Sequence, residues 1–227
     1  MAVTRYNILA YAVSGILISN LFICGCSGRK TPAKSETVSV SEIKDTSLLF
    51  DGKSLDGWEI TNFGPQGPVY VSGNAIILGM GDGCTGITWK RAFPRSGYEV
   101  SLDARRVAGT DFFCGMTFPV GKSPCSLIVG GWGGGTVGLS NIDGKDAAEN
   151  ETTTIRNFEK DKWYHIRLMV TDNSIESWID SLKVIDFNIG TKKLSIRPEV
   201  ELSRPFGIAS WNTTAAIRNI RLQRIGK

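Results

Sequence analysis

The sequence contains little histidine: His165 is the single one among 227 residues. Catalytic zinc sites usually take two or three histidine ligands, and the helical HExxH motif requires two. One chain therefore cannot form either kind of site. The sequence also lacks any run of five like charges, and 26 basic residues are nearly balanced by 22 acidic ones. Because nucleic-acid-binding proteins gather basic residues in one patch or segment, nucleic acid is not an expected partner.

A helical pattern is absent from the main part of the chain. From residue 48 onward, no window of a dozen residues shows an apolar stripe with helical spacing. Short runs rich in β-branched and aromatic residues are separated instead by glycine and asparagine. They predict strands at residues 69–71, 75–78, 85–89, 98–106, 111–118, 126–131, 136–140, 163–171, 174–179, 183–187, 206–210 and 216–224. So many short strands predict one all-β domain of two packed sheets, a β-sandwich.

Two of these segments show period-two alternation. Residues 163–170 place Tyr, Ile, Leu and Val on one face, with His165 and its alternate neighbours on the other. Residues 98–106 likewise separate an apolar face from a polar face that carries Glu99 and Asp103. The apolar faces are expected to form the core. A polar sheet face is either bare surface or a binding groove.

The N-terminus resembles an export signal. Arg5 is the single charge in the first 28 residues, and it precedes an apolar stretch over residues 8–24. Residues 23–26 read Ile-Cys-Gly-Cys, which resembles a bacterial lipobox and implies cleavage before Cys26 and lipidation of that cysteine. An uncleaved membrane helix is the alternative, because the apolar stretch is close to the shortest that spans a bilayer.

These patterns divide the chain into three parts. Residues 1–25 are expected to be a lipoprotein signal peptide, residues 26–46 a flexible tether rich in Ser, Thr and Lys, and residues 47–227 the folded domain. The expected location is outside the cytoplasm, in the periplasm or on the cell surface, with the N-terminal lipid holding the protein to a membrane. The oligomeric state is not predicted.

Three cysteines remain in the folded domain: Cys84, Cys114 and Cys125. An odd number cannot all form disulfides within one chain. A disulfide is permitted outside the cytoplasm, and Cys114 and Cys125 lie on neighbouring predicted strands. Buried thiols that behave as small apolar side chains are the alternative, so both states stay open.

A glycine-rich segment, residues 130–135, surrounds Trp132. A phosphate-binding loop would lead into a helix, whereas the residues that follow here are strand-like, which argues against that function. An exposed indole suits a sugar, because pyranose rings present apolar C–H faces to aromatic rings. Trp211 and Asn212 lie beside another polar turn and are further candidates for sugar binding. In the alternative, Trp132 folds back onto its own domain.

An acidic loop is the one candidate for a metal. Its carboxylates, hard oxygen ligands of the kind that calcium prefers, belong to Asp143, Asp146, Glu149 and Glu151. EF-hand spacing is absent, so a solvated loop is the alternative. No other cofactor or metal is expected. His165 has no GxSxG nucleophile motif to serve as a partner, which leaves a structural side chain or a catalytic base.

Three segments resemble a known family. Residues 49–58 (LFDGKSLDGW), 162–167 (KWYHIR) and 217–222 (IRNIRL) are similar to the LFNGKDLTGW, EWNxYRI and FRNIRI landmarks of the 3-keto-disaccharide hydrolase domain family. The resemblance implies a jelly-roll sandwich like those of concanavalin A and laminin G, export from a bacterial cell, and action on glycosides oxidised at C3. Trp58 and Ile220, from the first and last landmarks, are expected in the core near the joined ends of the domain.

The implied reaction requires a base and a donor. A ketone at C3 acidifies the C2 proton, so a base can remove it while a positive group holds the enolate. The chain departs from the family where many members have YExQxxD and QDHG, because residues 125–132 read CSLIVGGW and residues 209–212 read ASWN. An enzyme would then draw its base and its enolate donor from the remaining polar side chains, Asp111, Glu149, Glu151, His165 and Arg204.

Two functions without catalysis stay open beside the enzyme. The first is a glycan-binding module that uses Trp132, Trp211 and Asn212. The second is a surface interaction protein that uses the sandwich as a scaffold. A sugar or glycoside is the expected partner of the first and of the enzyme.

Overall fold

The computed structural model describes residues 46–225. The signal peptide predicted for residues 1–25, the lipidation site at Cys26 and the tether up to residue 45 lie outside the described residues. Within residues 46–225, no helix has the length and apolar character needed to cross a membrane.

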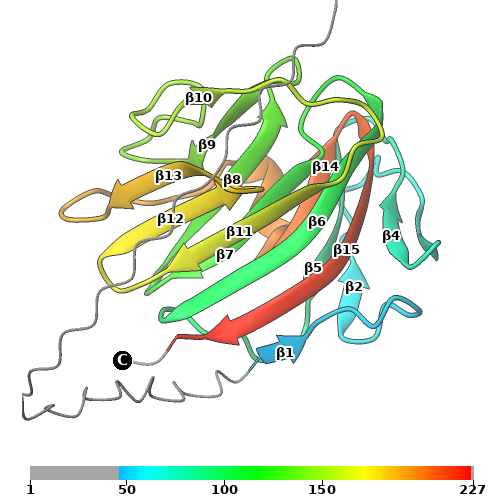
Figure 1. Ribbon diagram of the computed structural model, residues 1–227, viewed down its shortest axis with the longest axis horizontal. Helices are drawn as coiled ribbons and strands as arrows, with labels where there is room; N and C mark the ends of the chain where they lie inside the picture. The colour runs from blue at the N-terminus through cyan, green and yellow to red at the C-terminus, as the bar shows by residue number, and fades with distance from the viewer. Residues whose placement is uncertain (1–45, 226–227) are drawn as a thin grey trace, which may run out of the picture. The chain divides into compact units, whose positions relative to one another are not determined.

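Two antiparallel sheets pack face to face, which confirms the predicted all-β sandwich (Figure 1). Sheet A has the order β13 (Leu182–Asn188), β12 (Ser174–Ile179), β11 (Tyr164–Val170), β6 (Tyr98–Gly109), β15 (Thr213–Arg224), β4 (Ala75–Leu78) and β3 (Val69–Ser72), and β1 (Thr46–Leu48) also pairs with β15. Sheet B has the order β10 (Thr154–Ile155), β9 (Thr136–Ser140), β8 (Ser123–Gly131), β7 (Cys114–Val120), β14 (Gly207–Trp211), β5 (Cys84–Trp89) and β2 (Trp58–Ile60). A short 3₁₀ helix, η1 (Pro198–Ser203), precedes β14.

The core lies between the two sheets and follows the predicted alternation. In β11 and β6 the apolar set is buried, and the intervening polar residues are exposed or half-buried. On the sheet B side, Cys125, Leu127 and Val129 of β8 belong to the same core. The inward residues of both sheets therefore bury their apolar surface against one another, which stabilises the sandwich.

The first and last landmark segments meet through Leu49. Its backbone N–H donates to the carbonyl of Ile220 at 2.8 Å, and its own carbonyl accepts a hydrogen bond from the indole N–H of Trp58 at 2.7 Å. Trp58 is 7% exposed and Ile220 is fully buried. The predicted core position of both residues, near the joined ends of the domain, is confirmed.

The strand predictions differ from the structure mainly at the ends of elements. β1, β2 and β10 were not expected, and each has only two or three residues. Residues 111–113 were expected in a strand but lie outside β7. Asp111 donates its N–H to the Thr213 hydroxyl, and the Asp111 carboxylate accepts the N–H of Phe112. These side-chain bonds take up backbone groups that a strand would have used in its ladder.

Cys84, Cys114 and Cys125 are free, buried thiols in the structure. On the paired strands β7 and β8, Cys114 faces Val129 while Cys125 faces Phe118, so the two sulfurs are not opposite one another. Burial raises the pKa of each of the three thiols to about 12. They therefore stay protonated at neutral pH, and the structure agrees with the small-apolar alternative.

Candidate functional site

Small side chains cover the outer face of sheet B. In β8 the core residues alternate with Ser126 and Ile128, which point away from the core. The strand register extends these two positions into rows across the sheet. One row is Gly86, Ala209, Gly115, Ile128 and Gly138, and the next is Thr88, Gly207, Thr117, Ser126 and Ser140. Apart from Ile128, these side chains are short and allow other segments to approach the sheet closely.

Two segments lie directly on this face. A Cβ atom on Gly207 would come within 2.6 Å of the Ser203 carbonyl oxygen, so η1 packs against the backbone of β14. A Cβ atom on Gly138 would come within 2.7 Å of the Ala147 carbonyl oxygen, so the loop 141–150 packs against β9. Glycine is required at both positions because any side chain would displace these segments. A pocket opens on this face, and η1 together with the residue before it borders the pocket through Arg197, Glu199 and Val200.

This first pocket has a volume of about 210 Å³. Since drug-sized pockets measure roughly 300–1,000 Å³, the first pocket is suited to a single ring rather than to a long chain. Trp132, which is 43% exposed, Phe112 and Trp211 supply its aromatic surface. The remaining lining residues are Cys84, Asp111, Ser126, Ile128, Ser140, Arg197, Glu199 and Val200.

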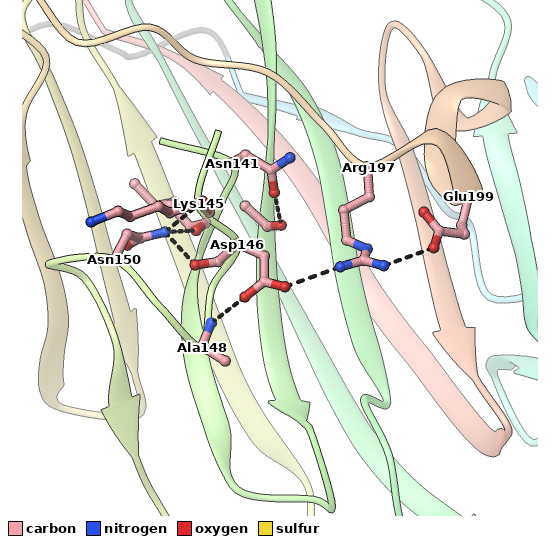
Figure 2. A network of polar contacts seen from close by, with 9 residues as sticks. Asn141, Lys145, Asp146, Ala148, Asn150, Arg197 and Glu199 are labelled. Carbon is pink, nitrogen blue, oxygen red and sulfur yellow. Dashed lines mark hydrogen bonds and ion pairs between the residues drawn. The ribbon is translucent and has the colours of Figure 1, made fainter. Parts of the chain in front are cut away.

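Arg197, which lines the first pocket, connects η1 to the loop 141–150 (Figure 2). Its Nη1 lies 3.0 Å from Asp146 Oδ2 in the loop 141–150, and its Nη2 lies 2.8 Å from Glu199 Oε1 in η1. Asp146 is itself held, because its Oδ1 accepts the Ala148 N–H and its carbonyl accepts the Asn150 amide. The Arg197 hydrogen bond lowers the pKa of Glu199, and the same bond raises the pKa of Arg197. Both groups are therefore charged at neutral pH.

Asp111 presents a carboxylate oxygen with free hydrogen-bonding capacity. Its Oδ1 accepts the N–H of Phe112 at 2.7 Å. Its Oδ2 accepts no hydrogen bond from residues 46–225, and the carboxylate forms no ion pair within that range. Since Asp111 lines the first pocket, this oxygen is available to a ligand there.

Arg106 holds the turn that presents Trp132. Residues 132–135 connect β8 and β9, and Trp132 has a φ of +47°. The Nη2 atom of Arg106 donates to the carbonyls of Asp111, Gly130 and Gly134 at 3.2, 3.1 and 2.8 Å. Sequence reasoning missed Arg106, although it continues the inward-facing set of β6. The signal in the sequence was an arginine at a position where the alternation of residues 98–106 predicts a side chain facing the core.

Three of the residues predicted for the site come together. Asp111, Trp132 and Trp211 all line the first pocket. Asn212 lies next to Trp211, where its side-chain oxygen accepts the N–H of Gly83 at 2.7 Å and so supports the turn between β14 and β15. Arg197 and Glu199, which also line the pocket, were not predicted.

The other predicted residues lie elsewhere. His165 is on the outer face of sheet A, where its Nδ1 is 2.8 Å from Asp103 Oδ1. Arg204 follows η1, pairs with Glu201 and borders a different pocket. Glu149 and Glu151 are exposed and outside the lining of the first pocket. The structure does not gather these four side chains with Asp111.

The acidic loop is engaged with basic side chains. Lys192 lies 3.2 Å from Asp143 and 2.8 Å from Glu151, while Asp146 pairs with Arg197. In the part of the chain that the structure describes, no three His, Cys, Asp or Glu side chains are grouped as metal ligands. Calcium binding by this loop stays a prediction.

Residues 45–223 match the family described as the 3-keto-alpha-glucoside-1,2-lyase-like domain. The chain belongs to this family. The 3-keto-alpha-glucoside-1,2-lyase-like domain is a carbohydrate-active module, so a sugar is its partner. No functionally curated protein is similar enough in sequence to narrow the assignment within the family.

Solved structures show where this fold recurs. Crh5 transglycosylase is 13% identical, with a TM-score of 0.57 over 81% of this chain and 85% of that one, and it has also been solved in complex with NAG. A candidate glycosyl hydrolase from Parabacteroides distasonis is 15% identical, with a TM-score of 0.52 over 80% and 94%. A Bacillus subtilis protein with a galectin-like fold is 11% identical, with a TM-score of 0.54 over 74% and 90%. At these identities the comparison concerns the fold, and it confirms the predicted jelly-roll sandwich.

Proposed function

We propose that this domain cleaves 3-keto-glycosides by elimination and hydration, with the oxidised ring held in the first pocket. The observation that carries the proposal is the composition of that pocket. Aromatic surface from Trp132 and Trp211 lies in the same pocket as the open Asp111 carboxylate and the Arg197 guanidinium. The family match supports a glycoside oxidised at C3 as the substrate class.

The pocket walls and floor suit a pyranose ring. Indole rings stack on the apolar C–H faces of sugars, and such aromatic contacts add to the stabilisation that burial alone provides. On the floor, the Ser126 hydroxyl lies 3.0 Å from the Thr117 hydroxyl, and Ser140 donates to the Asn141 side chain at 2.6 Å. The remaining capacity of these hydroxyl groups is available to the hydroxyl groups of a sugar.

In the proposed reaction, Asp111 acts as the base. Its carboxylate removes the proton from C2, and the electron pair of the broken C–H bond forms an enolate whose charge rests on O3. Arg197 donates hydrogen bonds to O3 and stabilises that charge. When the C3 carbonyl re-forms, a C1=C2 double bond is made, and the C1–O bond breaks. The departing oxygen takes the proton that Asp111 removed from C2, which returns Asp111 to its carboxylate form. Water then adds across C1 and C2, which completes a net hydrolysis.

The arrangement of charges favours Asp111 over Glu199 as the base. Arg197 engages Oε1 of Glu199, and this contact lowers the pKa of Glu199. A carboxylate stabilised in this way is a weaker proton acceptor. Asp111 has no such partner within the described residues. The ion pair also fixes Arg197 as a charged donor.

A glycan-binding module is the second candidate, and the sequence carries an observation in its favour. Residues 125–132 and 209–212 have no carboxylate or imidazole where many family members do. In that case the same pocket would bind a sugar ring without turnover.

The test is release of the leaving group from an aryl 3-keto-glucoside. Asp111→Asn is expected to lower kcat/KM at least about 100-fold, because a general base contributes about 10²–10⁴ in rate. Asp186→Asn is the matched control, since Asp186 is an exposed residue of β13 paired with Lys183 on sheet A. Sugar binding by the wild type without turnover would favour the glycan-binding module. Turnover at the wild-type rate by Asp111→Asn would contradict the assignment of the base.

A further inference from the structure

A second pocket shares Trp132 with the first. It has a volume of about 490 Å³ and is bordered by Trp132, Ile155 and Phe158 and by the backbone of residues 133–135. Ile155 of β10 is 72% exposed, so its side chain is open to solvent at this pocket. Because the Trp132 indole lines both pockets, the two pockets are neighbours. Binding of two adjacent sugar units of one glycan requires such an arrangement.

Arg106 gives the second pocket its charge. Among the described residues that line this pocket, Arg106 is the only charged one. Arg106 is only 8% exposed, and its guanidinium forms no ion pair with any residue in the range 46–225. Although burial lowers the pKa of Arg106, a guanidinium stays protonated at neutral pH. The second pocket therefore contains a buried positive charge that forms no direct ion pair within the described residues, although the Asp111 carboxylate attracts it without contact.

The hydrogen bonds of Arg106 leave one side of the guanidinium open. Nη2 is occupied by three backbone carbonyls. Nε is buried without a partner, while Nη1 forms no hydrogen bond within residues 46–225 and is not among the buried atoms. A Cβ atom on Gly134 would lie 3.2 Å from Nη1, so glycine at this position keeps the approach to Nη1 clear. The Nη1 donors are available to a bound group.

We propose that the second pocket binds an acidic sugar unit, whose carboxylate or sulfate group accepts a hydrogen bond from Arg106 Nη1. The inference rests on the proposed function, because that function places the neighbouring sugar ring in the first pocket. An anion is favoured because a buried cation attracts it more strongly than a surface cation would, and charge-assisted hydrogen bonds are about twice as strong as neutral ones. Trp132, Ile155 and Phe158 supply the apolar contacts for the ring.

The binding test compares matched disaccharides by calorimetry at low salt. The probes are glucuronosyl-(1→4)-glucose, its methyl ester, which is neutral, and the 6-sulfated form of a neutral glucosyl-(1→4)-glucose. The free acid is expected to bind at least about fivefold more tightly than its ester. The sulfated probe distinguishes the two acidic groups. If its affinity exceeds that of its neutral parent by as much as the affinity of the free acid exceeds that of the ester, the pocket accepts either group. If it does not, the pocket is specific for a carboxylate.

The variants change the charge at Ile155 rather than at Arg106, because loss of Arg106 would release three carbonyls of the Trp132 turn. Ile155→Glu places a negative charge at the exposed rim and is expected to remove the preference for the free acid. Ile155→Gln has the same size without the charge and is expected to keep it. Because Ile155 is 72% exposed, neither change removes core packing.

Equal affinities for acid and ester in the wild type, no binding of either, or an unchanged preference in Ile155→Glu would each overturn the inference. The same protein preparation is assayed with the aryl 3-keto-glucoside. Turnover there, without an acidic preference, retains the proposed function and rejects the acidic subsite. Absence of turnover with an intact acidic preference rejects the enzyme and retains the subsite.

Discussion

The outer faces of the two sheets contrast sharply, although both sheets share one core. On sheet A, Arg218 lies 4.0 Å from the centre of the Trp163 ring, and Arg167 lies 4.6 Å from that of Trp178 while pairing with Glu99 at 2.7 Å. On sheet B, short side chains leave a floor beside which η1 and the Trp132 turn border a pocket. Charged and aromatic side chains on the outer face of sheet A therefore contact one another, whereas the Asp111 carboxylate beside sheet B has an oxygen that accepts no hydrogen bond from the described residues.

The difference shows that polarity alone does not mark a binding face. Sheet A has the more charged surface, yet Asp103 is bonded there to His165, Arg218 and Asn219. Beside sheet B, Asp111 keeps a carboxylate oxygen without a partner among residues 46–225. Arg106, a core-facing residue of β6 in sheet A, keeps its Nε without one. An unpaired carboxylate oxygen in a pocket lined by aromatic rings, rather than the number of charges, distinguishes the face that suits a ligand.

The largest expected contrast is between two arginines. Arg197→Gln is expected to lower kcat/KM for an aryl 3-keto-glucoside about 100-fold, because one donor to a developing oxyanion contributes about that much. Arg167→Gln on sheet A should leave kcat/KM unchanged and lower the free energy of unfolding by about 1 kcal/mol, through loss of its ion pair and ring contact. Steady-state kinetics and urea unfolding measure both. Equal losses of kcat/KM in Arg197→Gln and Arg167→Gln would contradict the proposed distinction between the two faces.

A smaller contrast is expected between two tryptophans. Trp211→Ala should weaken binding of a 3-keto-glucoside about tenfold, since an aromatic contact contributes about 0.5–1.5 kcal/mol beyond the area that it buries. Trp178→Ala on sheet A removes an equal side chain at a distance from the first pocket and should leave sugar affinity unchanged. Calorimetric titration gives both dissociation constants. A loss of affinity only in Trp178→Ala would place the sugar on sheet A.

Asp103 tests the role of sheet A in stability. Although burial raises the pKa of Asp103, hydrogen bonds from His165, Asn219 and Arg218 hold it below the ordinary value of 3.8. Its contribution is therefore present above pH 3.8 and is lost as the pH falls through the lower folded-state value. Asp103→Asn should cost about 1 kcal/mol at pH 7 and less at pH 3. Urea unfolding at both pH values checks this, and an equal cost at both would contradict it.

The smallest expected effect concerns the support of Arg197. Asp146→Asn keeps the size of the side chain but removes the charge that faces Arg197 Nη1 at 3.0 Å. Arg197 would still pair with Glu199, so KM for the 3-keto-glucoside is expected to rise about threefold, as for loss of one partly exposed ion pair. Asp143→Asn, in the same loop but paired with Lys192, is the control. A larger rise in KM in Asp143→Asn would show that the effect comes from the loop as a whole and not from the support of Arg197.

Much of the fold was predictable because the core pattern is local. Alternation in β6 and β11 identified the buried set directly. β1 and β10 were missed because two or three residues carry no recognisable period, and their pairing partners are distant in sequence. The 3₁₀ helix η1 was missed because its six residues are too few to show a helical period.

The site was predictable only where its residues border a recognisable turn. Trp132 and Trp211 flank turns and were therefore candidates for sugar binding, whereas Asp111 was a candidate base at the start of a predicted strand. Arg197 lies in an irregular segment, and it reaches the pocket only because η1 packs on the glycine backbone of β14. His165 was correctly expected on the face opposite Tyr164, but alternation does not tell which sheet a strand joins. The pocket is a product of long-range packing.

The pairing of β1 with β15 has a consequence for protein engineering. Thr46 faces Gln223 in the register of these antiparallel strands, so the chain enters and leaves the sandwich at one point on its edge. A few added glycines could join those two positions, and the chain could be opened between Gly73 and Asn74, an exposed turn between β3 and β4. Such a circular permutant should keep both pockets, since none of the lining residues lies near the new ends in sequence. The same adjacency would allow the domain to be inserted into a surface loop of another protein without separating the ends of that loop.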